Sequence, residues 1–235
     1  MFPANVKFFS TSRFIENGVS NNNYANFNLA NHVGDEPNAV LANRQLLVSH
    51  YNLPAEPKWL DQCHSNICVN VDSPFSLKAD ASISQTPGVV CAVLTADCLP
   101  VFLCRKDGSA VGVVHAGWRG LLGGVIESSI KALDASKGGI LAHLGPGISQ
   151  DAFEVGAEVR EAFVDSNPDF ESAFIQFNNK YRLDLYNAAQ IVLVGQGVKS
   201  ITGGANCTYS EKNRYFSYRR DGEKSGRMAH LIWIA

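Results

Sequence analysis

The chain has 235 residues, of which 46% are hydrophobic and 18% charged, so it can bury a sizeable core and is not a disordered tail. Its 20 basic and 22 acidic side chains give a net charge of -2, which offers no broad positive field and argues against a nucleic acid partner. No apolar run reaches the roughly 20 residues that span a bilayer, and residues 1–10 lack the pattern of an export signal. We therefore expect a cytoplasmic protein with no membrane partner.

Nothing in the sequence marks an internal boundary. There is no repeat, low-complexity tract or Gly/Ser linker, and one large domain can hold a chain of this length, so we expect a single domain over residues 1–235. The six cysteines are dispersed and are expected to stay reduced. Cys91 and Cys104 lie in apolar runs and are interpreted as small buried hydrophobic residues.

The first expected element is a helix. Asp35 has the character of an N-cap residue, Pro37 lies just inside, and the pattern continues to about Tyr51. The residues expected on its inward face are Val40, Leu41, Leu47 and Val48.

The centre of the chain predicts strands. Residues 89–95, 99–104 and 111–115 are short, nearly continuous apolar runs, which is typical of strands buried on both faces. Residues 120–134 then carry apolar side chains at helical spacing and predict a helix.

The second half of the chain mixes both kinds of element. A strand is expected at 140–144, helices at 157–164 and 185–195, and strands at 215–218 and 228–234. Strands mixed with helices around one core predict an α+β domain, in which layers of mixed β-sheet pack with helices.

Three segments place metal-binding side chains at strand ends or in tight turns, where rigid elements can direct them into one cavity. They contain His64, Cys98 and His115. Imidazole and thiolate are the ligands that zinc prefers, and three protein ligands leave one tetrahedral position open, as in a catalytic site. If the strands that carry Cys98 and His115 are neighbours, their ends meet. The alternative is that these are ordinary buried His and Cys side chains.

Other segments allow an anion site. The glycines of His115–Gly120 can expose backbone amides to a phosphate before a helix, and Arg119 lies in the same segment, although a tight turn explains the glycines equally. The run Tyr218–Asp221 offers two guanidinium groups, but an arginine pair beside an aspartate is more often a surface ion pair.

Taken together, these segments resemble the YfiH-type laccase-domain family, also called the purine nucleoside phosphorylase or polyphenol oxidase family. The similarity extends over essentially the whole chain. The segments that carry it, in chain order, are Asn26–Leu29, His32–Asp35, Asn43–Arg44, Trp59–His64, Ala79–Ala81, Thr95–Pro100, His115–Gly120, Leu144–Ile148, Phe153–Gly156, Cys207–Tyr209, Phe216–Asp221 and Gly226–Arg227.

The resemblance implies a metal site and an activity. The family's metal ligands correspond to His64, Cys98 and His115, which are also the catalytic residues that we expect. The expected cofactor is zinc, with copper as the alternative. The family is described as cleaving adenosine, inosine, guanosine and methylthioadenosine with phosphate, giving a free base and ribose 1-phosphate, and as deaminating adenosine.

Four residues are the candidate substrate ligands. Arg44 is the expected phosphate ligand because a guanidinium binds phosphate oxygens two at a time, and Asn43 precedes it on the first helix. Arg119 is the third candidate. Asp97, beside Cys98, could orient His64 or His115 as a hydrogen-bond acceptor, or could cap a turn.

Two other activities remain open at this stage. A copper polyphenol oxidase is disfavoured because multicopper chemistry needs many histidines and only six are present. An amide hydrolase that edits cell-wall precursors would use Cys98 as nucleophile and His115 as base. The expected partners are a purine nucleoside and phosphate, and the expected state is a monomer, with a homodimer as the alternative.

Overall fold

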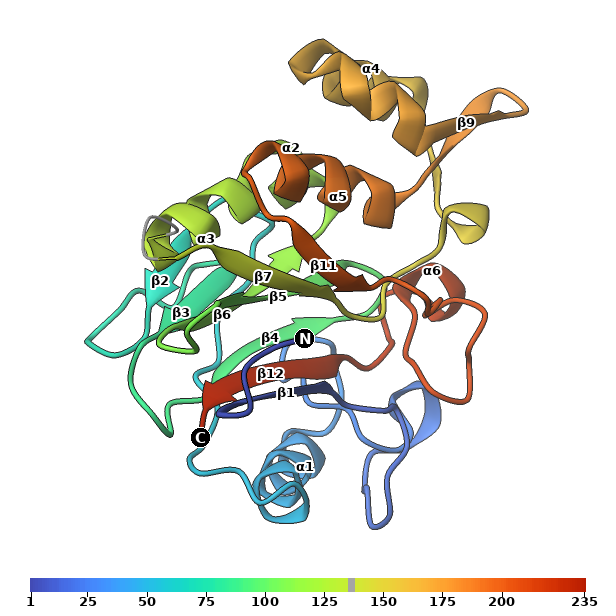
Figure 1. The fold of residues 1–235 in the computed structure, drawn as a ribbon. Coiled ribbons are helices and arrows are strands. Elements are labelled where there is room, and N and C mark those ends of the chain that lie inside the picture. Colours follow the sequence, from blue (N-terminus) through green and yellow to red (C-terminus); the bar gives the residue numbers. More distant parts are fainter. Residues whose placement is uncertain (135–137) are drawn as a thin grey trace.

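Two β-sheets lie face to face at the centre of the molecule, and helices cover their outer faces (Figure 1). The computed structural model describes residues 1–134 and 138–235. Its strands are β1 (Val6–Ser10), β2 (Cys68–Asn70), β3 (Ala81–Ser84), β4 (Cys91–Thr95), β5 (Leu99–Arg105), β6 (Val111–Ala116), β7 (Ile140–Leu144), β8 (Glu154–Val155), β9 (Phe174–Phe177), β10 (Lys180–Leu183), β11 (Ser200–Gly203) and β12 (Met228–Ile234). Its α-helices are α1 (Pro37–His50), α2 (Trp118–Leu122), α3 (Val125–Leu133), α4 (Ala157–Ser166), α5 (Leu185–Gly195) and α6 (Tyr218–Asp221), and short 3-10 helices cover Asn22–Tyr24, Gln150–Ala152 and Pro168–Ala173.

The larger sheet has six strands in the order β11-β7-β5-β6-β3-β2. Its central strands β5 and β6 pair antiparallel and are buried along their whole length, which confirms the prediction from their continuous apolar sequences. The parallel pairs β2-β3 and β7-β11 lie at its two edges, so the sheet is mixed.

The smaller sheet has three antiparallel strands in the order β1-β12-β4. Side chains such as Val93, Phe102 and Ile232 fill the space between the two sheets. On the opposite face, α1 packs against the small sheet through a second cluster that includes Leu47 and Leu231. The order of layers is therefore helix, sheet, sheet, helix (Figure 1).

Helices α2, α3 and α5 cover the outer face of the large sheet, and α4 lies beyond them with the three short strands β8-β10-β9 (Figure 1). One cluster joins this whole side, from Val114 on β6 through Ile126 on α3 and Leu193 on α5 to Phe163 on α4. The expected α+β class, with mixed sheet layers packed with helices in a single domain, is confirmed.

The first helix begins one residue later than expected. Glu36 occupies the N-cap position, whereas the Asp35 carboxylate accepts hydrogen bonds from the Glu36 amide and the Ser20 hydroxyl. Leu41 is 57% exposed, which corrects its expected place on the inward face. The buried face follows Val40, Asn43 and Leu47, and Leu41 is rotated about 100° from Val40 around the helix axis.

Two other expectations need correction. The helix predicted over 120–134 is divided into α2 and α3 because Gly123 and Gly124 interrupt it, and Gly124 has a φ of +89° that favours glycine. The strand predicted at 215–218 is absent: Tyr215 and Phe216 are buried in a loop, and the Phe216 amide donates to the Met228 sulfur instead of to a strand partner.

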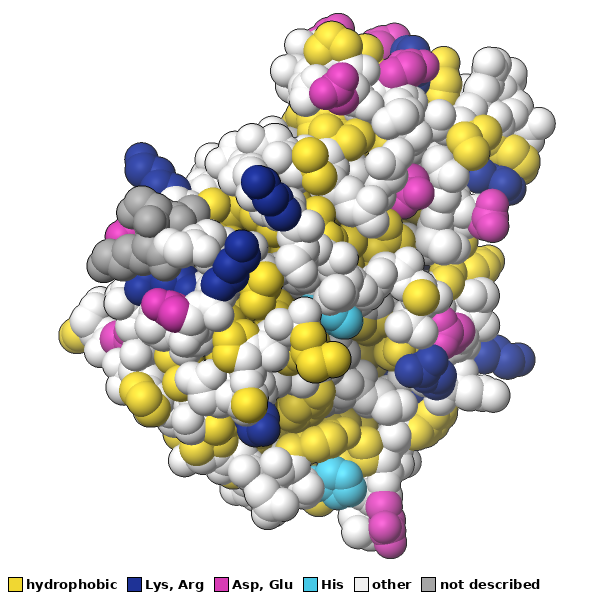
Figure 2. Space-filling view, viewed as in Figure 1, with side chains coloured by type: hydrophobic (Ala, Val, Ile, Leu, Met, Phe, Trp, Pro, Cys, Tyr) yellow, Lys and Arg dark blue, Asp and Glu magenta, His cyan; other side chains and the backbone are white. Residues whose placement is uncertain are grey.

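On the face seen in Figure 2, basic and acidic side chains are scattered and form no single region of one sign. Within residues 1–134 and 138–235, no helix is long and apolar enough to cross a lipid bilayer.

Candidate active site

The chain passes from the small sheet to the large one at residues 96–98, between the end of β4 and the start of β5. Cys98 is the last residue of this crossing. Because β5 and β6 pair antiparallel, with Pro100 opposite His115, the start of β5 lies beside the end of β6. The strands are neighbours, which is the condition under which their ends were expected to meet, and this pairing brings Cys98 close to His115.

His64 reaches the same place from the loop that precedes β2. Its backbone is in the left-handed region, with a φ of 60°. Its ring lies 4.8 Å from the His115 ring, centroid to centroid, and its Nε2 atom is 3.8 Å from the Cys98 Sγ. The metal-binding atoms of these three residues all lie within 4.8 Å of one another. The structure thus brings together the three side chains that the sequence singled out.

One buried carboxylate, Asp80, organises both histidines. It accepts hydrogen bonds from the backbone amides of Cys63, His64 and Ser65, at 3.2, 2.9 and 2.6 Å, and from the Ser65 hydroxyl at 2.7 Å. Its Oδ1 atom also lies 2.8 Å from the His115 Nδ1. Asp80 therefore fixes the loop that carries His64 and the ring of His115 at the same time.

Burial alone would raise the pKa of Asp80, but the hydrogen bonds from His115 and Ser65 outweigh it and lower the pKa below its usual range. The carboxylate stays ionised, and it can hold a proton on the Nδ1 of His115. The Nε2 of His115 is then left free to act as a ligand.

Burial would also raise the pKa of the Cys98 thiol, but the charge and hydrogen bonds of His115 and His64 outweigh it and lower the pKa to about 6. For His115, burial opposes protonation, but Cys98 and Asp80 raise the pKa to about 9. At pH 7 without a metal, the Cys98 thiolate therefore faces a protonated His115. Zinc, which prefers thiolate and imidazole ligands, would displace the proton on the Nε2 of His115 when it binds.

The space at this point fits a metal ion. Two ligand atoms on a tetrahedral zinc lie about 3.5 Å apart, so atoms within 4.8 Å need only a small contraction. Gly117 has no side chain to fill the space between the ligands. A Cβ added there would lie 2.8 Å from the His64 ring and 2.9 Å from the Cys98 sulfur. Among the residues that the structure describes, this is the only such group of His, Cys and acidic residues.

The three side chains open into a cavity of about 440 Å³, a volume typical of small-molecule sites. Its walls combine aromatic rings, three arginines and polar side chains. The lining residues are His32, Gln62, His64, Leu94, Thr95, Ala96, Asp97, Cys98, His115, Trp118, Arg119, Ile148, Phe153, Leu185, Tyr218, Arg219 and Arg227.

Two of the four expected substrate residues line this cavity. Arg119 lies over the Trp118 ring, with its guanidinium carbon 4.3 Å from the ring centroid. Asp97 lines the wall, but its carboxylate accepts from the hydroxyls of Thr208 and Ser217 and from the Arg219 amide, at 2.6, 3.0 and 2.6 Å. The carboxylate of Asp97 therefore stabilises the loop opposite it, and Asp80 is the acceptor that orients the histidines.

The structure does not bring Asn43 or Arg44 to the cavity wall. Asn43 is fully buried, and its amide group bonds the backbone of Val19 and Asn28. The Arg44 guanidinium donates to the Leu29 carbonyl at 3.0 Å and lies 4.3 Å from the Trp59 ring centroid. Both residues hold the segment that precedes α1.

Several residues of this site, above all Asp80 and Arg227, were not among the site residues predicted from the sequence. Both stand in segments that carried the family resemblance, Ala79–Ala81 and Gly226–Arg227, which was the one signal available. Their roles depend on contacts between segments far apart in the chain, and no local pattern shows them.

Fold and site together define an α+β domain with a His-Cys-His group at the junction of two sheets, open to a cavity. The chain belongs to the family whose model is described as multi-copper polyphenol oxidoreductase laccase, which matches residues 7–235.

Several named relatives are similar over nearly the whole chain. The purine nucleoside phosphorylase YfiH of Escherichia coli is 47% identical over 234 residues, which cover 99% of this chain and 95% of that protein. The purine nucleoside phosphorylase PA4543 of Pseudomonas aeruginosa is 43% identical over the same shares.

Solved structures show the same fold. The protein NMB0706 of Neisseria meningitidis superimposes with a TM-score of 0.91 at 44% identity, over 99% of this chain and 96% of that one. The hypothetical protein YfiH of Bacillus licheniformis gives a TM-score of 0.89 at 27% identity, over 98% and 93%.

Proposed function

We propose that this protein is a zinc-dependent purine nucleoside phosphorylase that also deaminates adenosine. Its substrates would be adenosine, inosine, guanosine and methylthioadenosine, each cleaved with phosphate to a free base and ribose 1-phosphate. The observation that carries the proposal is the His64, Cys98 and His115 group at the wall of a cavity with aromatic and cationic sides. The names of the relatives at 43% and 47% identity support the same activity.

The residues of the site fit each part of this chemistry. His64, Cys98 and His115 would hold zinc, which supplies Lewis-acid polarisation and activation of water. Phe153, Trp118 and Tyr218 offer faces on which a planar purine can stack. Arginine side chains on the same wall would bind the phosphate, which must approach the ribose carbon while the base departs.

A second activity has one specific observation in its favour. The lowered pKa of Cys98, beside His115, is what a cysteine nucleophile with a histidine base also requires, so an amide hydrolase is the alternative. A copper oxidase with several metal centres has less support, because the described residues form one group of metal-binding side chains.

The test is metal analysis of the purified protein together with product analysis from adenosine. We expect one zinc per chain, adenine released only when phosphate is present, and inosine formed with or without phosphate. His115→Ala should reduce both products at least about 100-fold, because it removes a metal ligand. His50→Ala, on the exposed end of α1, is the matched control and should leave both rates unchanged.

Failure takes a definite form. If the metal-free protein hydrolyses an amide of a cell-wall precursor and iodoacetamide abolishes that activity by alkylating Cys98, the cysteine hydrolase is correct. A zinc-loaded protein that forms neither adenine nor inosine contradicts the proposal.

A further inference from the structure

The cavity carries an excess of positive charge. Arg119, Arg219 and Arg227 line it, and Asp97 is the single acidic residue among the lining residues that the structure describes. The hydrogen-bonding capacity of Asp97 is already taken up by the Thr208 and Ser217 hydroxyls and the Arg219 amide. The cavity is therefore suited to an anion.

Arg227 differs from Arg119 and Arg219, which are exposed, because its guanidinium is half-buried and is held by hydrogen bonds at one nitrogen only. Nη1 donates to the Ser225 carbonyl, the Ser225 hydroxyl and the Gly226 carbonyl, at 2.6, 3.0 and 3.0 Å. Nε and Nη2 have no hydrogen-bond partner in the described parts of the chain, and Arg227 has no ion-pair partner there. The side chain is thus held in place with a free donor edge.

The backbone of Arg227 is also fixed. Its amide donates to the Asn28 Oδ1 at 3.0 Å, and the Asn28 carbonyl in turn accepts from Asn43 at 3.0 Å. Burial lowers the pKa of Arg227, although the charges of Cys98 and Asp97 raise it in part. Arg227 lines the same cavity as His64, Cys98 and His115. A cation that is largely removed from water gains strongly from an anionic partner.

His32 supplies a second donor on the same wall. Burial is the main cause that lowers the pKa of His32, and the charges of Arg227 and Arg44 lower it further. The His32 imidazole is therefore mainly neutral at pH 7. A neutral imidazole can donate one N–H to an anion.

Arg119 and Arg219 are better placed for another role. Both are exposed, and each lies over an aromatic ring, Trp118 at 4.3 Å and Phe153 at 5.2 Å from guanidinium carbon to centroid, whereas Arg227 is half-buried and lies 5.8 Å from the Tyr218 centroid. Arg219 also donates to the Glu154 carbonyl at 3.0 Å. They belong to the aromatic rim, where the base would stack.

We propose that Arg227, together with His32, binds the phosphate co-substrate. This assignment rests on the proposed phosphorylase function. Within that function, Arg227 is the residue that holds phosphate in the cavity. Nε and Nη2 of Arg227 form the fork that can bind two phosphate oxygens at once.

The experiment compares wild type, Arg227→Gln and Arg227→Lys, all loaded with zinc, using inorganic phosphate as the probe. For Arg227→Gln we expect a rise of about 10- to 100-fold in the KM for phosphate, because a charge-assisted bidentate contact is lost. Phosphate-independent formation of inosine from adenosine should fall by a smaller factor than the KM for phosphate rises, because phosphate takes no part in that reaction. Inorganic phosphate should raise the melting temperature of the wild type and leave that of Arg227→Gln unchanged.

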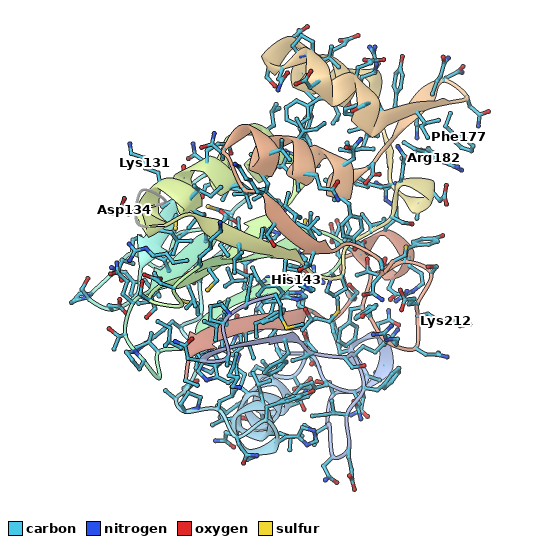
Figure 3. All side chains as sticks on the ribbon, viewed as in Figure 1. Lys131, Asp134, His143, Phe177, Arg182 and Lys212 are labelled. Carbon is cyan, nitrogen blue, oxygen red and sulfur yellow. The ribbon has the colours of Figure 1, made fainter. Side chains whose placement is uncertain are left out.

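Two further variants make the result specific. Arg227→Lys keeps the positive charge and loses the pair of donors on Nε and Nη2, so its KM for phosphate should lie between those of the wild type and Arg227→Gln. If Arg227→Gln does not fold, Arg227→Lys takes its place in the comparison. Arg182→Gln is the matched control. Arg182 lies on β10 beside Phe177 (Figure 3) and does not line the cavity, so its loss should alter neither the KM for phosphate nor the thermal shift.

The outcomes separate this inference from the function on which it rests. If wild type releases adenine with phosphate and Arg227→Gln keeps the same KM and thermal shift, the phosphate site is wrong and the phosphorylase stands. If wild type forms no adenine, the phosphorylase fails, and the thermal shift alone decides whether Arg227 binds phosphate: its loss in Arg227→Gln supports the site, and its persistence overturns it.

Discussion

At the scale of single residues, the site depends on one carboxylate and one missing side chain. Asp80 holds the His64 loop and the His115 ring, and Gly117 leaves the space between His64 and Cys98. Neither residue binds a metal itself. Both decide whether the three ligand atoms can come close enough to share one ion.

Gly117→Ala should therefore weaken metal binding. A methyl group at this position would lie within 3 Å of the His64 ring and the Cys98 sulfur, so one of the two must move away. We expect zinc affinity, measured by competition with a chelator, to fall at least tenfold. Gly195→Ala is the matched control, because an added Cβ there meets nothing within 4 Å, and it should leave zinc affinity unchanged. Equal affinity in the two variants would contradict this account of Gly117.

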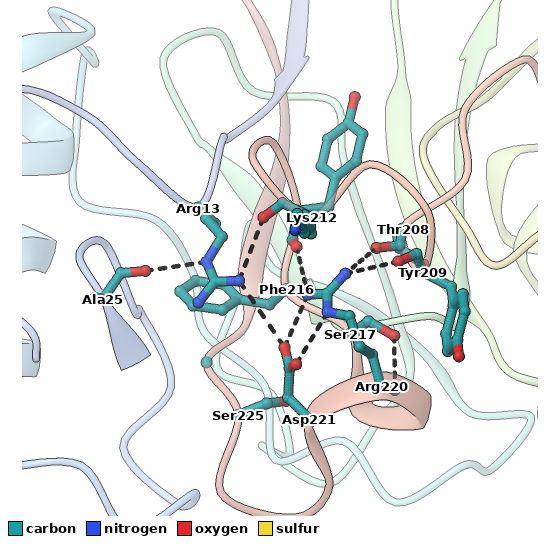
Figure 4. Close-up of polar contacts among 12 residues, drawn as sticks. Arg13, Ala25, Thr208, Tyr209, Lys212, Phe216, Ser217, Arg220, Asp221 and Ser225 are labelled. Atoms are coloured by element: carbon teal, nitrogen blue, oxygen red, sulfur yellow. Dashed lines mark hydrogen bonds and ion pairs between the residues drawn. The ribbon is translucent and has the colours of Figure 1, made fainter. Parts of the chain in front are cut away.

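At the scale of elements, a loop that ends in the short helix α6 forms one wall of the cavity. Residues 207–221 carry Tyr218 and Arg219, and Arg220 stabilises the loop from inside (Figure 4). The Arg220 guanidinium donates to the carbonyls of Thr208, Tyr209 and Tyr215, at 2.9, 2.8 and 3.0 Å.

The same guanidinium also bonds both carboxylate oxygens of Asp221, at 2.9 and 2.8 Å. Arg13, near the start of the chain, lies 3.9 Å from Asp221 and donates to the Ala25 carbonyl at 3.0 Å. One charged network thus joins the two ends of the chain beside the cavity.

Arg220→Gln should loosen this loop. It removes a mostly buried cation and leaves three carbonyls and the Asp221 carboxylate without their donor, so we expect a loss of about 2–3 kcal/mol in the free energy of unfolding. Urea denaturation measures it, and the KM for adenosine should rise because Tyr218 and Arg219 move with the loop. Arg214→Gln, which removes an exposed pair with Glu211, should cost less than about 0.5 kcal/mol. Similar losses in both variants would show that Arg220 is not the stabilising residue.

At the scale of the whole molecule, the two sheets enclose a histidine that resists protonation. His230 on β12 is fully buried, and its ring nitrogens lie 2.7 and 2.8 Å from the hydroxyls of Ser10 and Thr95. Burial, and then the charge of His115, lower its pKa to about 3, against 6.5 in the unfolded chain. Between these pH values the unfolded chain binds a proton that the folded chain excludes, so stability falls as the pH falls below 6.5.

His230→Gln should flatten this acid dependence. The free energy of unfolding of the metal-free protein is measured by urea denaturation between pH 4 and pH 6.5. We expect the wild type to lose roughly 1 kcal/mol more per pH unit than the variant, since one proton is taken up on unfolding. The variant should be less stable at pH 7, where the wild-type hydrogen bonds are intact. Parallel slopes for the two proteins would contradict this role of His230.

The sequence was sufficient for the strongly periodic parts of this molecule. Strands β4, β5 and β6 were predicted because their apolar runs are continuous, α3 because its apolar spacing is helical, and α1 because Asp35 and Pro37 mark the start of a helix. Short strands such as β2 and β8 have too few residues for a pattern. The division into two sheets was not predictable, since alternation along a strand does not say which sheet the strand joins.

The same limit applies to the site. His64, Cys98 and His115 could be named because residue type alone suggests a ligand. Arg44 and Arg227 are equally basic in the sequence, and only the folded chain shows that Arg44 packs on Trp59 while Arg227 faces the cavity.

The position of Cys98, where the chain crosses from one sheet to the other, has a consequence for the order of assembly. Cys98 is separated from His64 and His115 by long stretches of chain, and only native strand pairing makes them neighbours. An extended chain offers no such set of donors, so a metal ion would find its three ligands only after these strands have paired. A bound ion would then stabilise the native form relative to the unfolded chain.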